Sequence, residues 1–320
     1  MNILPKENNN EENKKLNFIF FGTDDFSVSV LKELKEKGFI PKILVTAPNR
    51  PAGRGQKIHE PSAKIWVKEI NVAEKLNIKI LQPEHLDMNF TAEILKQKWD
   101  FFVTASYGKI ISKEVLEIPE RVAFNVHPSL LPLYRGASPV ESAILDDSRE
   151  TGVTIMMMDE KMDHGPILNQ EFVYFDEWPI KLEVEEKLAV IGGQLLAETI
   201  NQYLNNEIGE QEQDHTVATF TKKITKEMGQ IKFSDLERAS SNEKLAREIF
   251  VKVQALNPWP GVFFFIKHED KEMRVKIKEA EWITHTNSSE SSYGKLEITK
   301  VLPEGKKEMN YGDFLRGYIK

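Results

Sequence analysis

Three polar residues near the middle of the chain have the chemistry for acyl transfer. Asn125 and His127 end an apolar run, and Asp163 opens an Asp-His-Gly sequence further along. A side-chain amide can donate a hydrogen bond to a developing oxyanion, an imidazole can move a proton, and a carboxylate can orient and charge-stabilise the imidazole. Taken singly, Asn125 is more often a turn cap and His127 a satisfied core or surface histidine. Together with Asp163, they favour a catalytic interpretation.

A covalent nucleophile and a metal are not expected at this site. The chain has no cysteine, and Ser129 precedes Leu-Leu-Pro rather than lying in a Gly-x-Ser-x-Gly elbow. Direct transfer to an external amine is therefore a simpler hypothesis than a serine hydrolase mechanism. The seven histidines are scattered without ligand spacing, so the sequence predicts no metal site.

The elements that position these residues alternate between strand and helix. Apolar runs predict strands at residues 16–21, 41–46, 78–81, 100–104, 123–126 and 152–156, and helical patterns separate many of them. This alternation predicts an α/β fold with a Rossmann-like, doubly wound, mostly parallel sheet, whose ligands bind beyond the strand carboxyl ends. Asn125 and His127 lie at such an end. The first strand is not followed by Gly-x-Gly-x-x-Gly, so a dinucleotide cofactor is not expected.

Changes in composition and hydrophobic pattern divide the sequence into four parts. Residues 1–16, rich in Asn, Glu and Lys, predict a disordered extension, and residues 17–204 are expected to form the catalytic domain. Residues 205–225 are polar enough to be a linker. Residues 226–320 predict a small OB-like β-barrel domain, from one helix and the apolar runs at 261–266, 273–277 and 295–298.

Charge and hydropathy restrict the class of protein. The formal net charge is -7, yet residues 221–320 carry 19 Lys and Arg against 15 Asp and Glu. A weakly basic C-terminal part could offer a polyanion one preferred face, or be an ordinary mix of surface charges. No apolar run reaches the roughly 18 residues of a membrane span. We therefore expect a cytoplasmic monomer with no membrane partner.

A cationic segment is the second candidate site. Residues 48–57 read Pro-Asn-Arg-Pro-Ala-Gly-Arg-Gly-Gln-Lys, and Arg50, Arg54, Lys57 and Lys64 face only Glu60 within residues 49–64. A flexible cationic loop is suited to phosphate contacts or to ordering against a nucleic acid. Composition alone fits a mobile surface loop equally well.

The order of these motifs resembles the 10-formyltetrahydrofolate-dependent formyltransferase family, and within it the branch that formylates initiator methionyl-tRNA. The resemblance covers roughly residues 17–320. The motifs that carry it are Asn-x-His-x-Ser-Leu-Leu-Pro from Asn125, Arg-Gly-Ala-x-Pro from Arg135, Glu-Thr-Gly-Val-Thr-Ile from Glu150, Asp-x-Gly from Asp163 and Asn-Pro-Trp-Pro around Trp259. The chain departs from the family at Asp24, where Pro is common, and at Leu133-Tyr134, where a more basic or Trp-containing pair is common.

The resemblance implies roles for these residues. The methionine amine would attack the formyl carbon of 10-formyltetrahydrofolate, Asn125 and protonated His127 would stabilise the oxyanion, and Asp163 would help hold the imidazolium. The segment Ser129, Leu130, Leu131 and Pro132 would contact folate. The cationic loop, with Arg54 as principal residue, would engage the acceptor end of the tRNA.

Position in the fold adds one expectation and leaves alternatives open. Tyr107 and Gly108 follow a predicted strand, and we expect them to line the same crevice as the folate segment. A formyltransferase acting on a sugar or ribonucleotide amine, a 10-formyltetrahydrofolate hydrolase, and a non-enzymatic nucleotide- or RNA-binding protein remain alternatives. The cationic loop and the slightly basic C-terminal part favour tRNA.

Overall fold

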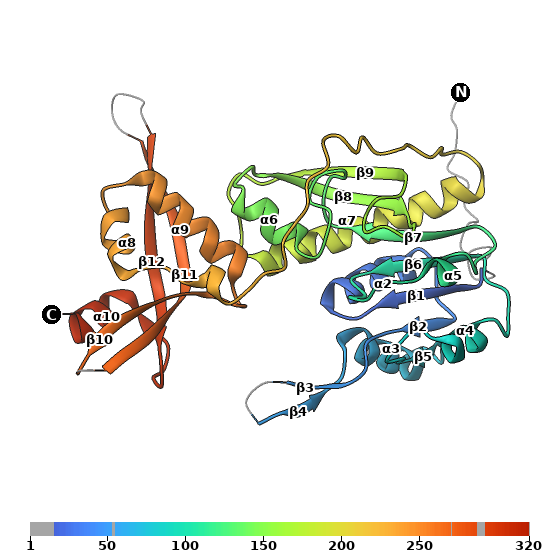
Figure 1. Cartoon of the computed structure of the whole chain (residues 1–320), viewed down its shortest axis with the longest axis horizontal. Coiled ribbons are helices and arrows are strands. Elements are labelled where there is room, and N and C mark those ends of the chain that lie inside the picture. Colours follow the sequence, from blue (N-terminus) through green and yellow to red (C-terminus); the bar gives the residue numbers. More distant parts are fainter. Residues whose placement is uncertain (1–15, 53–54, 270, 287–291, 320) are drawn as a thin grey trace. The chain divides into compact units, whose positions relative to one another are not determined.

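The computed structural model describes residues 16–52, 55–269, 271–286 and 292–319 (Figure 1). Contacts divide the chain into two compact units. The first combines the chain up to residue 137 with residues 151–173 and 185–220, and the second combines residues 138–150, 174–184 and 221–320. Segments 138–150 and 174–184, which lie within the expected catalytic domain, therefore group with the C-terminal part by contact.

A seven-stranded sheet with the order β5-β2-β1-β6-β7-β8-β9 forms the centre of the N-terminal half. Its strands are β1 (Phe18–Gly22), β2 (Ile43–Val45), β5 (Lys79–Leu81), β6 (Phe101–Ala105), β7 (Val122–His127), β8 (Glu150–Met157) and β9 (Ile167–Tyr174). The pairs from β5 to β7 are parallel, whereas β7 and β8 are antiparallel. The predicted α/β fold with a mostly parallel sheet is confirmed.

The two central strands of the sheet, β1 and β6, are almost entirely apolar. Every residue of β1 and β6 is buried, as expected for parallel strands covered on both faces. Phe18 and Phe101 stack between them, with ring centroids 4.8 Å apart. The helices of this half are α2 (Asp25–Glu36), α3 (Ser62–Ala73), α4 (Met88–Ile94), α5 (Lys113–Leu116) and α7 (Lys181–Leu204), as Figure 1 shows.

The loops after β1 and β6 meet at the point where the strand order reverses. From β1 the chain goes to β2 and β5 on one side and then returns to β6 on the other, which makes this a topological switch point. Two hydrogen bonds join the loops: Thr23 Oγ1 donates to the Tyr107 carbonyl (3.0 Å) and Ser106 Oγ to Asp24 (2.5 Å). A third joins the adjoining elements, from Ser27 Oγ on α2 to the Ala105 carbonyl at the end of β6 (2.7 Å). Asp24 also caps α2 by accepting from the Ser27 amide. The departure from the family at residue 24 thus has a local structural role.

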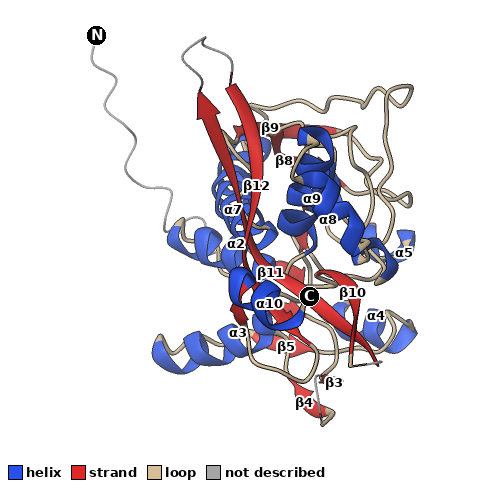
Figure 2. Ribbon diagram, turned by 90° about the vertical axis from the view of Figure 1, so that its left-hand side faces the viewer, coloured by secondary structure: helices blue, strands red, loops and turns tan. Residues whose placement is uncertain are grey.

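The second unit contains a four-stranded antiparallel sheet. Its strands β10 (Val262–His268), β11 (Lys271–Thr286), β12 (Ser292–Pro303) and β13 (Met309–Asn310) are neighbours in sequence order. Its helices are α6 (Pro139–Leu145), α8 (Phe233–Ala239), α9 (Glu243–Leu256) and α10 (Tyr311–Tyr318), and a short 3-10 turn (Glu227–Gly229) precedes α8. The predicted C-terminal β domain is confirmed, although β11 and β12 form a much longer pair than the sequence indicates (Figure 2).

Arg247 on α9 binds both chain segments that join the second unit from earlier in the sequence. Its guanidinium donates to both carboxylate oxygens of Asp147 (2.6 Å each) and of Glu177 (2.7 Å each). The same group lies 5.1 Å from the Phe250 ring centroid and 4.9 Å from that of Trp282. Bidentate pairs of this kind are strong charge-assisted contacts. The two carboxylates raise the pKa of Arg247 against the lowering effect of burial.

Arg247→Met is expected to lower the free energy of unfolding by about 2 to 3 kcal/mol, since it leaves the half-buried Asp147 carboxylate without its cation and leaves Glu177 with only its 3.5 Å pair to Arg149. The measurement is urea unfolding followed by tryptophan fluorescence. Arg238→Met is the matched control, because Arg238 forms an exposed pair with Asp235, and exposed pairs contribute less than about 1 kcal/mol. Equal stability of the two variants would contradict the role assigned to Arg247.

Candidate active site

The end of β7 presents Asn125 and His127 on one face. Alternate residues of a strand point to the same side, so the two side chains emerge together beyond the sheet. Asn125 is half-buried, and His127 is 4% exposed. The first two of the three expected polar groups are therefore neighbours because of strand geometry.

Asp163 comes from the loop between β8 and β9 and reaches both of these side chains. Its Oδ1 lies 3.5 Å from Asn125 Nδ2 and 3.6 Å from His127 Nδ1, and its Oδ2 accepts a 2.7 Å hydrogen bond from the Gly136 amide. The loop is tight: Asp163 has φ of +51°, and a Cβ on Gly165 would lie 2.2 Å from the Met157 carbonyl oxygen. The structure thus brings Asn125, His127 and Asp163 into one cluster.

The proton on His127 is placed by a backbone group. Nε2 lies 3.1 Å from the carbonyl oxygen of Tyr134, and because a carbonyl only accepts, Nε2 is the donor in this hydrogen bond. Nδ1 is left facing the Asp163 carboxylate, at a distance too long for a hydrogen bond. From the sequence, Asp163 is expected to orient the imidazole, whereas in the structure the hydrogen bond to the Tyr134 carbonyl fixes the tautomer. Nδ1 is consequently the nitrogen that can exchange a proton with a reactant.

The Ser129–Pro132 segment forms a rigid turn beside this cluster. Ser129 Oγ donates to the Leu133 carbonyl, and Thr154 Oγ1 both donates to the Ser129 carbonyl and accepts from the Leu131 amide. Leu131 is buried, whereas Leu130 and Pro132 are half-buried. The Ser129 hydroxyl is thus engaged within the turn, and the partly exposed side chains are Leu130 and Pro132.

Tyr107 and Gly108 differ in their exposure. The expected crevice-lining position of Tyr107 does not hold for its side chain, which is 3% exposed and packs against Phe21. The turn after β6 passes through Ser106 at φ of +48° and directs the next side chain into the core. Burial raises the pKa of Tyr107 to about 12. At Gly108 a Cβ would meet no atom within 4 Å, so its backbone faces open space.

The cationic segment contains a short two-stranded ribbon where the sequence indicates only a loop. β3 (Arg50–Ala52) pairs with β4 (Lys57–His59). Arg50 forms an exposed ion pair with Glu84 (2.6 Å), and Lys57 is exposed. Arg54 lies outside the described residues. On this ribbon, Lys57 is therefore open to solvent. Arg50 is held only by an exposed ion pair, which water and salt can disrupt.

Lys64 stabilises the base of this ribbon and does not add to its exposed positive charge. Its ammonium group bonds to Asn49 Oδ1 (3.0 Å), Gln82 Oε1 (2.6 Å) and Glu60 (2.8 Å), and its side chain is 12% exposed. Hydrogen bonds from Lys64 and Lys68 lower the pKa of Glu60 to about 2. This cation, which the sequence groups with the loop, is thus used structurally.

Two further polar residues that sequence reasoning assigned no role are buried beside the cluster. Arg135 is 3% exposed and Gln213 is 5% exposed, and the two side chains bond to each other. Gln213 lies in the segment expected to be a polar linker. A glutamine in a polar segment is expected to be exposed, so nothing in the sequence indicated that Gln213 is buried beside the cluster.

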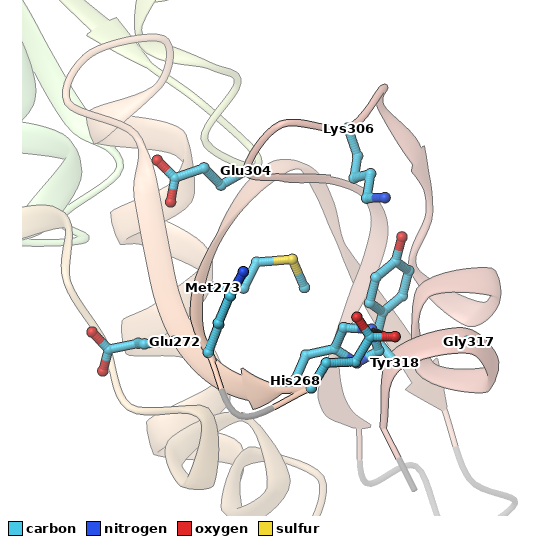
Figure 3. A pocket seen from close by; sticks show the side chains of 9 residues that line it. His268, Glu272, Met273, Glu304, Lys306, Gly317 and Tyr318 are labelled. Atoms are coloured by element: carbon cyan, nitrogen blue, oxygen red, sulfur yellow. Dashed lines mark ion pairs between the residues drawn. The ribbon is translucent and has the colours of Figure 1, made fainter.

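A separate cavity of about 570 Å³ lies in the second unit (Figure 3). Its walls come from the adjoining ends of β10 and β11, from the turn between β12 and β13 and from α10, with His268, Met273, Glu304, Lys306 and Tyr318 among them. None of the candidate residues lines it. Across the part of the chain that is described, no helix has the length and apolar character to cross a membrane, and no group of three side chains is arranged for a metal ion.

Comparisons with known proteins identify the family of the chain. The Formyl transferase family model matches residues 14–200, and the model described as Formyl transferase, C-terminal domain, matches residues 223–319. The methionyl-tRNA formyltransferase of Natranaerobius thermophilus is 36% identical, over 94% of this chain and 96% of the relative. That of Thermodesulfovibrio yellowstonii is 34% identical, over 93% and 95%.

Solved structures show the same fold. An N-formyltransferase from Helicobacter canadensis, in complex with folinic acid and dTDP-3-aminofucose, matches with a TM-score of 0.58 at 16% identity, over 87% of this chain and 98% of that one. The methionyl-tRNA formyltransferase from Clostridium thermocellum matches with a TM-score of 0.52 at 16% identity, over 88% and 98%. With both family models matched and the curated relatives aligned along nearly their whole length, the chain belongs to the methionyl-tRNA formyltransferase family of enzymes.

Proposed function

We propose that this enzyme transfers the formyl group of 10-formyltetrahydrofolate to the free amino group of methionine on initiator methionyl-tRNA. The observation that carries the proposal is the Asn125, His127 and Asp163 cluster at the end of β7. It supplies an oxyanion donor, a proton carrier and a carboxylate, with no covalent nucleophile needed. The curated relatives named for this reaction support the acceptor.

The surface beside the cluster fits a flat pterin donor. Leu130 and Pro132 offer partly exposed apolar walls, and the Gly108 backbone at φ of +78° faces open space. Backbone donors and acceptors beside apolar side chains suit a heteroaromatic ring that also carries polar edges. We therefore retain the turn 129–132 and the backbone of residues 107–108 as the donor-binding surface.

The reaction proceeds by direct attack. The methionine amine nitrogen forms a bond to the formyl carbon, and the carbonyl electrons move onto oxygen to give a tetrahedral intermediate. Asn125 Nδ2 and protonated His127 Nδ1 donate to this oxygen, whose charge is largest in the transition state. The attacking nitrogen loses a proton, with Asp163 accepting through water, and folate N10 gains one as its bond to carbon breaks. The products are formylmethionyl-tRNA and tetrahydrofolate.

The transfer itself is tested with a donor labelled with ¹³C in the formyl group. The enzyme is incubated with this donor and charged initiator methionyl-tRNA, the ester is hydrolysed, and the products are identified by mass spectrometry. The proposal expects labelled formylmethionine and tetrahydrofolate in equal amounts. Labelled free formate without formylmethionine would instead identify a hydrolase that uses water as acceptor.

The exposed ribbon cation Lys57 is proposed to contact tRNA phosphate. Lys57→Ala is expected to raise the KM for tRNA about 3- to 10-fold with kcat unchanged, and to reduce the slope of log KM against log salt by about 0.7 to 0.9. Lys32→Ala on α2 removes the same charge from another exposed position and should leave both values unchanged. Equal effects of the two variants would show that only net charge matters. Arg54 is retained as a proposed contact in the same loop.

A further inference from the structure

Gln213 is buried, although it lies in a polar segment that connects two elements and would be expected to be exposed. It lies beyond α7 among exposed residues, yet only 5% of it is exposed. Its Nε2 donates to the carbonyl oxygens of Asp163 (3.1 Å) and Gly165 (2.7 Å), and its Oε1 accepts from Arg135 Nε (3.2 Å) and Nη2 (2.6 Å). The amide is therefore saturated on both sides.

The partners of this side chain specify glutamine. A guanidinium only donates hydrogen bonds, so it must face the amide oxygen, and backbone carbonyls only accept, so they must face the amide nitrogen. A glutamate of the same shape would bind Arg135 but would place a carboxylate oxygen against the carbonyls of Asp163 and Gly165. Burial makes such an unpaired contact expensive. Replacement by Glu is thus a nearly isosteric way of breaking one side of the network.

Arg135 is itself fixed in orientation. Its Nη2 also donates to His215 Nδ1 (2.8 Å). The His215 ring stacks on that of His164, with centroids 4.1 Å apart and planes 12° apart, and His164 Nδ1 lies 2.7 Å from Asp159 Oδ2. His164 is the residue between Asp163 and Gly165. The segment around Gln213 therefore holds the loop between β8 and β9 in two ways. Gln213 bonds to the loop backbone at residues 163 and 165, and His215 stacks on the ring of His164.

The loop needs such support. Asp163 adopts the left-handed backbone conformation, which costs about 1 to 2 kcal/mol for most L-residues and less for Asp. From this backbone position the Asp163 carboxylate makes its 2.7 Å bond to the Gly136 amide and faces Asn125 and His127. The two hydrogen bonds from Gln213 fix the carbonyl groups of residues 163 and 165, and their loss would leave the backbone on both sides of His164 without this restraint.

We propose that Gln213 is a positioning residue for formyl transfer, acting through the backbone of Asp163. This inference rests on the proposed function. Gln213→Glu is expected to lower kcat about 10- to 100-fold, since displacement of a reacting group by about 1 Å can cost 10²-fold in rate. The KM values for 10-formyltetrahydrofolate and for tRNA should stay within about twofold, because Gln213 contacts the loop and not the proposed binding surfaces.

The experiment compares the steady-state kinetics of wild type, Gln213→Glu and Gln211→Glu. Gln211 is exposed and two residues away, so its variant introduces the same charge without touching the loop and should behave as wild type. Each variant is also made in the Asp163→Asn background. If Gln213 acts through Asp163, the Gln213→Glu loss should shrink to less than about threefold there, because coupled residues are not additive.

Three outcomes overturn the inference: wild-type kcat in Gln213→Glu, a rise in KM with kcat unchanged, or the full loss again in the Asp163→Asn background. Should Gln213→Glu fail to fold by circular dichroism, Gln213→Met carries the same comparison, because it removes the donors without adding charge. A wild-type enzyme that forms no formylmethionine would refute the proposed function. A wild-type enzyme that is active, with active Gln213 variants, would refute this inference alone.

Discussion

Replacing His127 by alanine is expected to lower kcat for formyl transfer by about 10²- to 10⁴-fold. The variant loses the proton carried on Nδ1, which is the ring nitrogen left free by the 3.1 Å bond from Nε2 to the Tyr134 carbonyl. It also loses one of the two donors to the oxyanion. The measurement is the single-turnover rate with saturating donor and initiator methionyl-tRNA, which excludes effects on binding and on product release.

The control for this variant is His85→Ala. His85 is an exposed histidine outside the cluster, and its removal should leave the rate unchanged. The thermal unfolding midpoint of both variants is recorded, so that lost activity is not confused with lost structure. Turnover by His127→Ala at the wild-type rate would remove the imidazole from the mechanism.

Asp163→Asn is expected to lower kcat by about 10²-fold or more while the fold stays intact. Asparagine has the same shape and tolerates the left-handed conformation at φ of +51°, and its oxygen can still accept from the Gly136 amide. What it lacks is the negative charge facing His127 Nδ1 and the capacity to take up a proton. The rate is again measured under single-turnover conditions.

The comparison that makes this result specific is Asp159→Asn. Asp159 belongs to the same loop and pairs with His164 at 2.7 Å, so its variant removes the same charge from a residue that supports the loop but contacts none of the three cluster residues, and a smaller loss is expected. A loss in Asp159→Asn as large as that in Asp163→Asn would indicate a general effect of loop charge. It would contradict a direct role of the Asp163 carboxylate.

The sequence predicts the centre of the fold because buried parallel strands leave a plain signal. The Phe18–Gly22 and Phe101–Ala105 strands are uninterrupted apolar runs between turn residues. The position of Asn125 and His127 follows, because side chains at the carboxyl end of a strand in such a sheet face the ligand crevice. What spacing cannot show is that Asp163, 36 residues after His127, returns to this end; that depends on the antiparallel course of β8.

The missed features share physical causes. β9 mixes buried and exposed residues without alternation, so it has no period that distinguishes it. The side chain of Tyr107 turns inward because Ser106 takes a left-handed conformation that composition does not reveal. Gln213 and Lys64 are polar residues whose partners come from distant segments. Polarity predicts exposure for both, and only the tertiary contacts show otherwise.

The identity of the acceptor separates the proposed function from its alternatives, and one measurement addresses it directly. Formyl transfer from 10-formyltetrahydrofolate is followed with charged initiator methionyl-tRNA, with charged elongator methionyl-tRNA and with no acceptor, at equal enzyme concentration. The proposed function predicts rapid formation of formylmethionyl-tRNA with the initiator, and little tetrahydrofolate in the other two reactions. Release of tetrahydrofolate at the same rate in all three would contradict it, and would assign the Asn125, His127 and Asp163 cluster to a hydrolase instead.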